Sequence, residues 1–150
     1  MIETLKKANE KWDKYTQGMT GTIIYIALGF FIAFMVNAGI GLMLETDTPM
    51  VAVFSKSMVP TFEKGDLVVV SGQEFEVSVG DIIVFDIGNR NYPIIHRVYE
   101  IQKDGDIITK GDNNGYEDPW IVDPDTVHGK ALFRVPYLGW IKVLFVEMFS

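Results

Sequence analysis

The chain has 150 residues, of which 48% are hydrophobic and none is a cysteine. This length suits one folded domain with a modest core, and the absence of cysteine excludes disulfides, a thiol nucleophile and thiolate metal sites. The 20 acidic residues outnumber the 13 basic ones, and because a net negative charge repels phosphate backbones, we expect no nucleic-acid partner.

A segment of membrane-spanning character occupies residues 21–44. It contains no charged residue, and its only strongly polar side chain is Asn37. Because about 20 apolar residues in a helix cross a hydrocarbon core of about 30 Å, the segment predicts a retained transmembrane anchor. The alternatives are a buried core helix and a cleaved secretory signal, although a signal would be shorter and end in small residues rather than in Met43, Leu44 and Glu45.

Basic residues precede this anchor and acidic residues follow it. Residues 1–20 carry four lysines, namely Lys6, Lys7, Lys11 and Lys14. Because a lysine bias keeps a flanking segment in the cytoplasm, we expect residues 1–20 to be cytoplasmic and everything after the anchor to be extracytoplasmic. Apolar residues at helical spacing within 1–20 indicate either a short helix on the membrane surface or a solvated tail. They are Ile2, Leu5, Ala8, Trp12 and Tyr15.

Beyond Pro49 the pattern changes to short apolar runs of strand length, separated by glycine, asparagine and aspartate in turn positions. These runs cover 50–54, 66–70, 81–85, 93–101, 106–109 and 127–135. The pattern predicts one mainly β domain over residues 49–150. The stretch 135–149 is apolar but contains Lys142 and Glu147, which favours a final strand or an interfacial segment over a second span.

With two histidines and no cysteine, the economical route to catalysis is a hydroxyl nucleophile with a histidine base. His96 fits as the base, and strand periodicity places it on the face of Ile94 and Val98, opposite Arg97. Spacing alone favours a structural histidine, which is how we interpret His128. No cluster has the spacing of metal ligands, so we expect no metal and no cofactor.

Other candidates for such chemistry lie in turns. Ser55 and Ser57 come directly after the first apolar run and could present a hydroxyl at a fixed position. Asp112 and Asp118 could supply the carboxylate that orients an imidazole. Taken alone, all of them are better explained as ordinary turn or surface residues, so the residue types and spacing leave the function open.

The order of several motifs is more specific. The string SKSMVPTFEKGDLVVV at 55–70 resembles the serine motif of type I signal peptidases. Further matches follow in the same chain order: GDIIVF at 80–85, IHRV at 95–98, KGDNN at 110–114 and VPYLGW at 135–140. The resemblance implies a signal-peptidase-like β catalytic domain behind one N-terminal transmembrane helix.

One position indicates the branch of this family. Bacterial members carry a lysine where this chain has His96, so the chain is similar to the archaeal and endoplasmic-reticulum branch. The resemblance implies that Ser57 is the nucleophile and His96 the general base. It implies that Asp118 and Asp112 assist the imidazole, and we favour Asp118 as its direct partner. It also implies that the Ser55 hydroxyl and the Ser57 backbone N–H form the oxyanion hole.

Lys56 departs from the family pattern, which commonly has a small residue between the two serines. Adjacent side chains on an extended segment point to opposite sides. We therefore expect Lys56 to face away from the Ser57 hydroxyl and not to act as a base.

The resemblance also implies a substrate and a location. The substrates are preproteins cleaved after Ala-x-Ala-like sites, lying extended against the strands near 50–54 and 81–85. The partners are signal peptides and the lipid bilayer of the cell membrane or the endoplasmic reticulum, with the protein-translocation machinery as a candidate. Two alternatives remain: a non-catalytic membrane-anchored β module that binds peptides, and a self-cleaving repressor type of serine protease, which uses lysine and normally lacks an anchor.

Overall fold

The computed structural model describes residues 3, 5–7, 12–13, 18–73, 76–88, 90 and 92–149. The chain divides into two compact units, Met1–Ile40 and Gly41–Ser150. Most of the segment expected to form either a surface helix or a solvated tail, including Ile2, Ala8 and Tyr15, lies outside the described residues.

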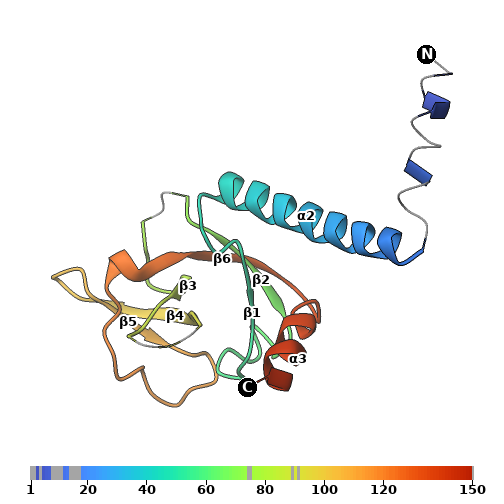
Figure 1. The fold of residues 1–150 in the computed structure, drawn as a ribbon. Coiled ribbons are helices and arrows are strands. Elements are labelled where there is room, and N and C mark those ends of the chain that lie inside the picture. Colours follow the sequence, from blue (N-terminus) through green and yellow to red (C-terminus); the bar gives the residue numbers. More distant parts are fainter. Residues whose placement is uncertain are drawn as a thin grey trace. The chain divides into compact units, whose positions relative to one another are not determined.

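Helix α2, Gly18–Leu44, contains the predicted anchor (Figure 1). Among the described residues it is the one helix that is long and apolar enough to cross a membrane, and none of its most apolar window is buried. Its 27 residues rise about 40 Å, which exceeds a hydrocarbon core of about 30 Å. A helix that is apolar all round and remains uncovered by protein is suited to lipid.

The C-terminal end of α2 is closed by a turn. Glu45 has a positive φ of 51°, and the backbone N–H of Thr46 donates to the carbonyl of Gly41 over 3.1 Å, as in helix-ending motifs of the left-handed type. The N–H of Gly72 then donates to the carbonyl of Leu44 over 2.7 Å. This backbone hydrogen bond joins the last turn of the helix to the end of β2.

The second unit is built on one six-stranded antiparallel sheet (Figure 1). Its strands are β1 (Met50–Ala52), β2 (Leu67–Ser71), β3 (Ile82–Phe85), β4 (Ile94–Ile101), β5 (Ile107–Lys110) and β6 (Val127–Val135). They lie in the order β1-β2-β6-β3-β4-β5. Each predicted run overlaps one of these strands, with β2 and β5 ending one residue beyond their runs, and the mainly β class is confirmed.

Strand β3 separates two apolar clusters. Val84 belongs to a cluster with residues of β1, β2 and the turn at 55–62, here called the serine turn. Ile83 and Phe85 belong to a second cluster with Val98 and Ile107. All three β3 residues are 0% exposed. A strand buried on both faces needs a continuous apolar run rather than alternation, which explains the IIVF sequence.

The C-terminal stretch differs from expectation. The prediction of a final strand is wrong beyond Val135, where β6 ends, because the chain turns and forms helix α3, Trp140–Phe149. This helix contacts β1 and buries Val143 completely. On the same helix, Glu147 pairs with Lys64 over 2.6 Å. An interfacial role for this segment stays a prediction.

The first Gly-Asp pair of the signal-peptidase-like motifs has a structural role. Asp66 is 2% exposed and accepts hydrogen bonds from the N–H of Glu63 and from Arg134 over 2.9 and 2.7 Å. Burial raises the pKa of Asp66, but the bonds from Glu63, Arg134 and Tyr137 outweigh it and lower the pKa below 3.8. The ionised carboxylate therefore ties the turn before β2 to the end of β6.

Candidate active site

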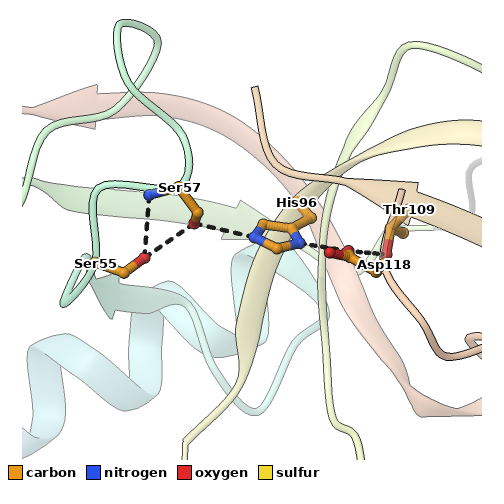
Figure 2. Close-up of polar contacts among 5 residues, drawn as sticks. All are labelled: Ser55, Ser57, His96, Thr109 and Asp118. Carbon is orange, nitrogen blue, oxygen red and sulfur yellow. Dashed lines mark hydrogen bonds and ion pairs between the residues drawn. The ribbon is translucent and has the colours of Figure 1, made fainter. Parts of the chain in front are cut away.

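Three of the predicted site residues meet in one hydrogen-bonded chain (Figure 2). Ser57 lies in the turn after β1, His96 on β4 and Asp118 in the loop after β5. Nε2 of His96 lies 3.0 Å from Oγ of Ser57, and Nδ1 lies 2.5 Å from Oδ2 of Asp118. Because a carboxylate only accepts, Nδ1–H donates to Asp118, which leaves Nε2 to accept the Ser57 hydroxyl proton.

The three hydrogen-bonded residues differ in burial. The side chains of His96 and Asp118 are 8% and 4% exposed, whereas Ser57 is only partly buried. The hydrogen bond between His96 and Asp118 therefore lies where a low local dielectric strengthens polar interactions. The hydroxyl lies where an incoming group can reach it.

Ser55 lies beside the Ser57 hydroxyl (Figure 2). Their Oγ atoms are 2.9 Å apart, and the N–H of Ser57 points to Oγ of Ser55 over 3.5 Å. Since the Ser57 proton is donated to His96, Ser55 is the donor between the two hydroxyls. A second hydroxyl and a backbone N–H thus lie next to the atom expected to attack.

Lys56 is exposed, and within the described part of the chain its ammonium group makes no hydrogen bond or ion pair. The reasoning from strand alternation does not apply, however, because residues 55–57 form a bend and a turn rather than an extended segment. The turn itself, not a β pleat, sets the direction of each side chain here.

The turn at 111–114 holds the serine turn in place. The backbone N–H of Asn113 donates to the carbonyl of Ser57 over 2.7 Å, and its side-chain amide donates to the carbonyl of Lys56 over 3.2 Å. A Cβ on Gly111 would lie 2.7 Å from the Ser57 carbonyl oxygen and 3.0 Å from Nε2 of His96. From the sequence these residues looked like turn formers, and only the KGDNN match singled them out.

The close approach of Gly111 to Ser57 and His96 leads to a testable prediction. With Ser57 and His96 in the roles that the resemblance implies, we expect Gly111→Ala to lower kcat for peptide cleavage about a hundredfold, because a misplacement of catalytic groups by about 1 Å costs that much. Gly115→Ala is the matched control in the same turn, since a Cβ there meets nothing within 4 Å. Steady-state kinetics of both variants test this, and equal activity of the two would contradict it.

Asp112 is brought near the site but is engaged elsewhere. Its carboxylate accepts two bonds from Arg97, over 2.8 and 2.7 Å, and one from the Thr61 hydroxyl. The bond from Arg97 lowers the pKa of Asp112 below 3.8; burial opposes this, and Thr61 and the nearby His96 add to the lowering. Asp112 therefore links the serine turn to β4 on the face opposite His96, as predicted for Arg97.

Two further polar residues differ in their relation to the site. Thr109, which sequence reasoning missed, donates from Oγ1 to Oδ2 of Asp118 over 2.7 Å (Figure 2). No sequence signal distinguished it from the other residues of its strand. The second histidine, His128, pairs with Asp86 over 2.9 Å. Within the described residues, no group of three or more histidines and carboxylates could hold a metal ion.

A cleft of about 300 Å³ adjoins the hydrogen-bonded chain, lined by Ala52, Phe54 and Met58 together with Ser57 and His96. Phe54 stacks on Tyr92 at a ring distance of 5.7 Å and forms part of the wall. The cleft thus joins an apolar surface to a hydroxyl and an imidazole.

The strand pairing around the cleft corrects one expectation. We predicted that substrate adds as a strand beside residues 81–85. This is wrong, because both edges of β3 are already paired, with β4 and with β6. The start of β4 is different: Ile94–Arg97 pair with β3, but pairing with β5 begins only at Arg97. In the described sheet, residues 94–96 therefore keep one free edge beside the cleft.

Comparison with known proteins identifies the family of the chain. The Peptidase S24-like family model matches residues 30–132. The signal peptidase complex catalytic subunit SEC11 of Scheffersomyces stipitis is 32% identical over 133 residues, covering 81% of this chain and 80% of that protein. The chain belongs to the type I signal peptidases, in their endoplasmic-reticulum branch. As a member of this peptidase family, it is a protease.

Two more relatives of this signal peptidase extend the agreement. The catalytic subunit SEC11C of Homo sapiens is 33% identical over 153 aligned positions, covering 93% of this chain and 76% of the relative. The catalytic subunit sec11 of Dictyostelium discoideum is 33% identical over 133 positions, covering 81% and 74%. The family resemblance found in the motifs is therefore confirmed.

Proposed function

We propose that the protein is a single-pass membrane serine endopeptidase that removes signal peptides from preproteins. Ser57 is the nucleophile, His96 the general base and Asp118 the carboxylate that orients the imidazole. The observation that carries this proposal is the hydrogen-bonded chain Ser57–His96–Asp118 in a member of a peptidase family. The same geometry serves serine proteases of unrelated folds.

The reaction follows from the two hydrogen bonds of His96. Nε2 removes the proton from Oγ of Ser57 as the oxygen attacks the scissile carbonyl carbon, and it returns the proton to the leaving amine. Asp118 holds the tautomer in which Nε2 is free to accept and stabilises the imidazolium. Water then hydrolyses the acyl–Ser57 ester by the same proton route.

The oxyanion of the tetrahedral intermediate is stabilised by Ser55. Its hydroxyl donates to Ser57 in the free protein, and rotation about its side chain redirects that proton to the oxyanion. The backbone N–H of Ser57, 3.5 Å from Ser55 Oγ, is the second donor. Each such donor contributes about 2.7–4 kcal/mol to the transition state.

The substrate lies extended in the cleft between the end of β1 and the start of β4. Its backbone pairs with the free edge of residues 94–96, as in peptide recognition by strand addition. The small apolar cleft, walled by the Phe54–Tyr92 stack, accepts short side chains. This favours cleavage after Ala-x-Ala-like sites.

The location follows from the anchor. Helix α2 crosses the membrane once, with the lysine-bearing N-terminal segment in the cytoplasm and the β domain on the far side, in the endoplasmic reticulum or, in a cell without one, at the cell membrane. The relatives are named as subunits of a signal peptidase complex, so we propose that this chain works with accessory subunits, near the translocation machinery.

Cleavage of a preprotein tests the function directly. We expect the detergent-solubilised protein to release a product whose new N-terminus, read by sequencing, follows a small residue. An acylating serine-protease inhibitor should modify Ser57, as mapped by mass spectrometry. A preprotein that binds but stays intact, together with an unmodified Ser57, would favour the peptide-binding module instead.

A further inference from the structure

Thr109 is a buried hydroxyl at the far end of the proposed catalytic chain. It lies on β5 opposite Val98 of β4 and is 0% exposed. Its Oγ1 lies 2.7 Å from Oδ2 of Asp118, the same oxygen that lies 2.5 Å from Nδ1 of His96 (Figure 2). The backbone N–H of Asp118 also donates to the Thr109 carbonyl over 2.9 Å. Thr109 and Asp118 are therefore joined twice.

We propose that Thr109 is a positioning residue for the reaction of Ser57, His96 and Asp118, and that its hydroxyl keeps the shared proton on Nδ1 of His96. This inference rests on the proposed function. Thr109 touches neither substrate nor the reacting atoms, and it acts through the carboxylate of Asp118.

The direction of the hydrogen bond explains the effect. Oδ2 of the carboxylate can only accept, so the threonine hydroxyl donates to it. With two donors on one oxygen, its lone pairs are both directed and the carboxylate cannot rotate away from the imidazole. The second donor also spreads the negative charge, which makes Oδ2 a weaker competitor for the Nδ1 proton. Because the site is buried, bulk water does not substitute for a lost hydroxyl.

The other charges near the imidazole are accounted for. Asp112 lies close enough to interact with His96 electrostatically, but its charge is balanced by Arg97 on the opposite face of β4. Arg90 lines the same cleft and lies over the ring of Trp120. Lys56 on the serine turn is exposed. Among the described charged groups around the imidazole, only Asp118 is hydrogen-bonded to the ring. A change at its carboxylate oxygen therefore has the most direct effect on His96.

The test compares Thr109→Val, which keeps the shape but lacks the hydroxyl, with Thr109→Ser, which keeps the hydroxyl. We expect Thr109→Val to lower kcat for preprotein cleavage about tenfold with KM unchanged, since one hydrogen bond to a charged group is lost. The acid limb of its kcat/KM profile should move to higher pH. Without the hydrogen bond from Thr109, the Asp118 carboxylate keeps more negative charge and favours the protonated imidazole. Thr109→Ser should restore both properties.

A merely structural role predicts different results. In that case Thr109→Val lowers the unfolding temperature but leaves the pH profile in place, or Thr109→Ser is as impaired as Thr109→Val. Either outcome overturns the proposal. Thermal unfolding measured in the same detergent identifies any loss of fold.

A second readout separates this proposal from the proposed function. The His96 ring is titrated by NMR in wild type and in both variants, with His128→Gln used to assign the two histidine signals. We expect the His96 midpoint to rise in Thr109→Val and to return in Thr109→Ser, whether or not preprotein is cleaved. An unchanged midpoint overturns the role of Thr109, whereas absence of cleavage by wild type overturns the function.

Discussion

Ser57→Ala is expected to lower kcat for preprotein cleavage roughly a millionfold, because the hydroxyl forms the covalent bond and members of a catalytic triad act as a unit. His96→Ala should cause a similar loss, and the double variant should be little worse than either single one. Substrate binding should persist, since alanine substitution leaves the backbone of the free β4 edge and the apolar wall of Ala52, Phe54 and Met58 in place.

Lys56→Ala is the matched control for this prediction, one residue away in the same turn. Its side chain is exposed and contributes nothing to the hydrogen-bonded chain, so we expect nearly wild-type kinetics. Single-turnover assays in detergent or reconstituted vesicles measure all of these variants. A large loss in Lys56→Ala with activity retained in His96→Ala would indicate a serine–lysine mechanism instead.

Asp118→Asn is the second large effect, with an expected fall in kcat of about 10⁴-fold. An amide at this position can donate to Nδ1 and so favour the wrong tautomer, with Nε2 carrying the proton. The fold should be retained, because asparagine matches aspartate in shape. We therefore expect a normal unfolding transition with almost no turnover.

Asp112→Asn is the comparison that separates the two aspartates. It removes the charge between Arg97 and Thr61, so we expect a loss of about 1–2 kcal/mol in the free energy of unfolding and a smaller fall in kcat than for Asp118→Asn. A larger catalytic loss in Asp112→Asn than in Asp118→Asn would reverse their assignment.

The destabilisation caused by Asp112→Asn should depend on pH. The folded state lowers the pKa of Asp112 below its ordinary 3.8, so its contribution to stability is full above that value and is lost as the pH falls through the lower, folded-state pKa. The difference in unfolding free energy between wild type and the variant should be constant near neutral pH and shrink below about pH 4. Denaturation curves at several pH values measure it.

Some features were predictable because they depend on local spacing. The charge-free run 21–44 determined a helix of membrane-spanning length, which the structure extends to Gly18. Short apolar runs bounded by turn residues placed each strand, and strand periodicity put His96 on the face opposite Arg97. Ordered motifs then identified the family and selected Ser57 from otherwise ordinary turn serines.

Other features depended on which segments meet. Helix α3 was missed because its short apolar sequence also fits a strand, and contact with β1 decides between them. The argument on Lys56 assumed an extended segment where the chain forms a turn. The strand at 81–85 looked available for substrate until the sheet order placed it between two neighbours.

The sequence by itself determined a helix of membrane-spanning length, the mainly β class and the family, and through the family motifs it predicted roles for Ser57 and His96. Only the tertiary structure decided that Asp118, rather than Asp112, is hydrogen-bonded to the imidazole, and that Thr109 donates a hydrogen bond to Asp118. The physical reason is that local patterns set the face on which a side chain lies. The register between β4 and β5 sets which side chains, distant in sequence, come within hydrogen-bond distance.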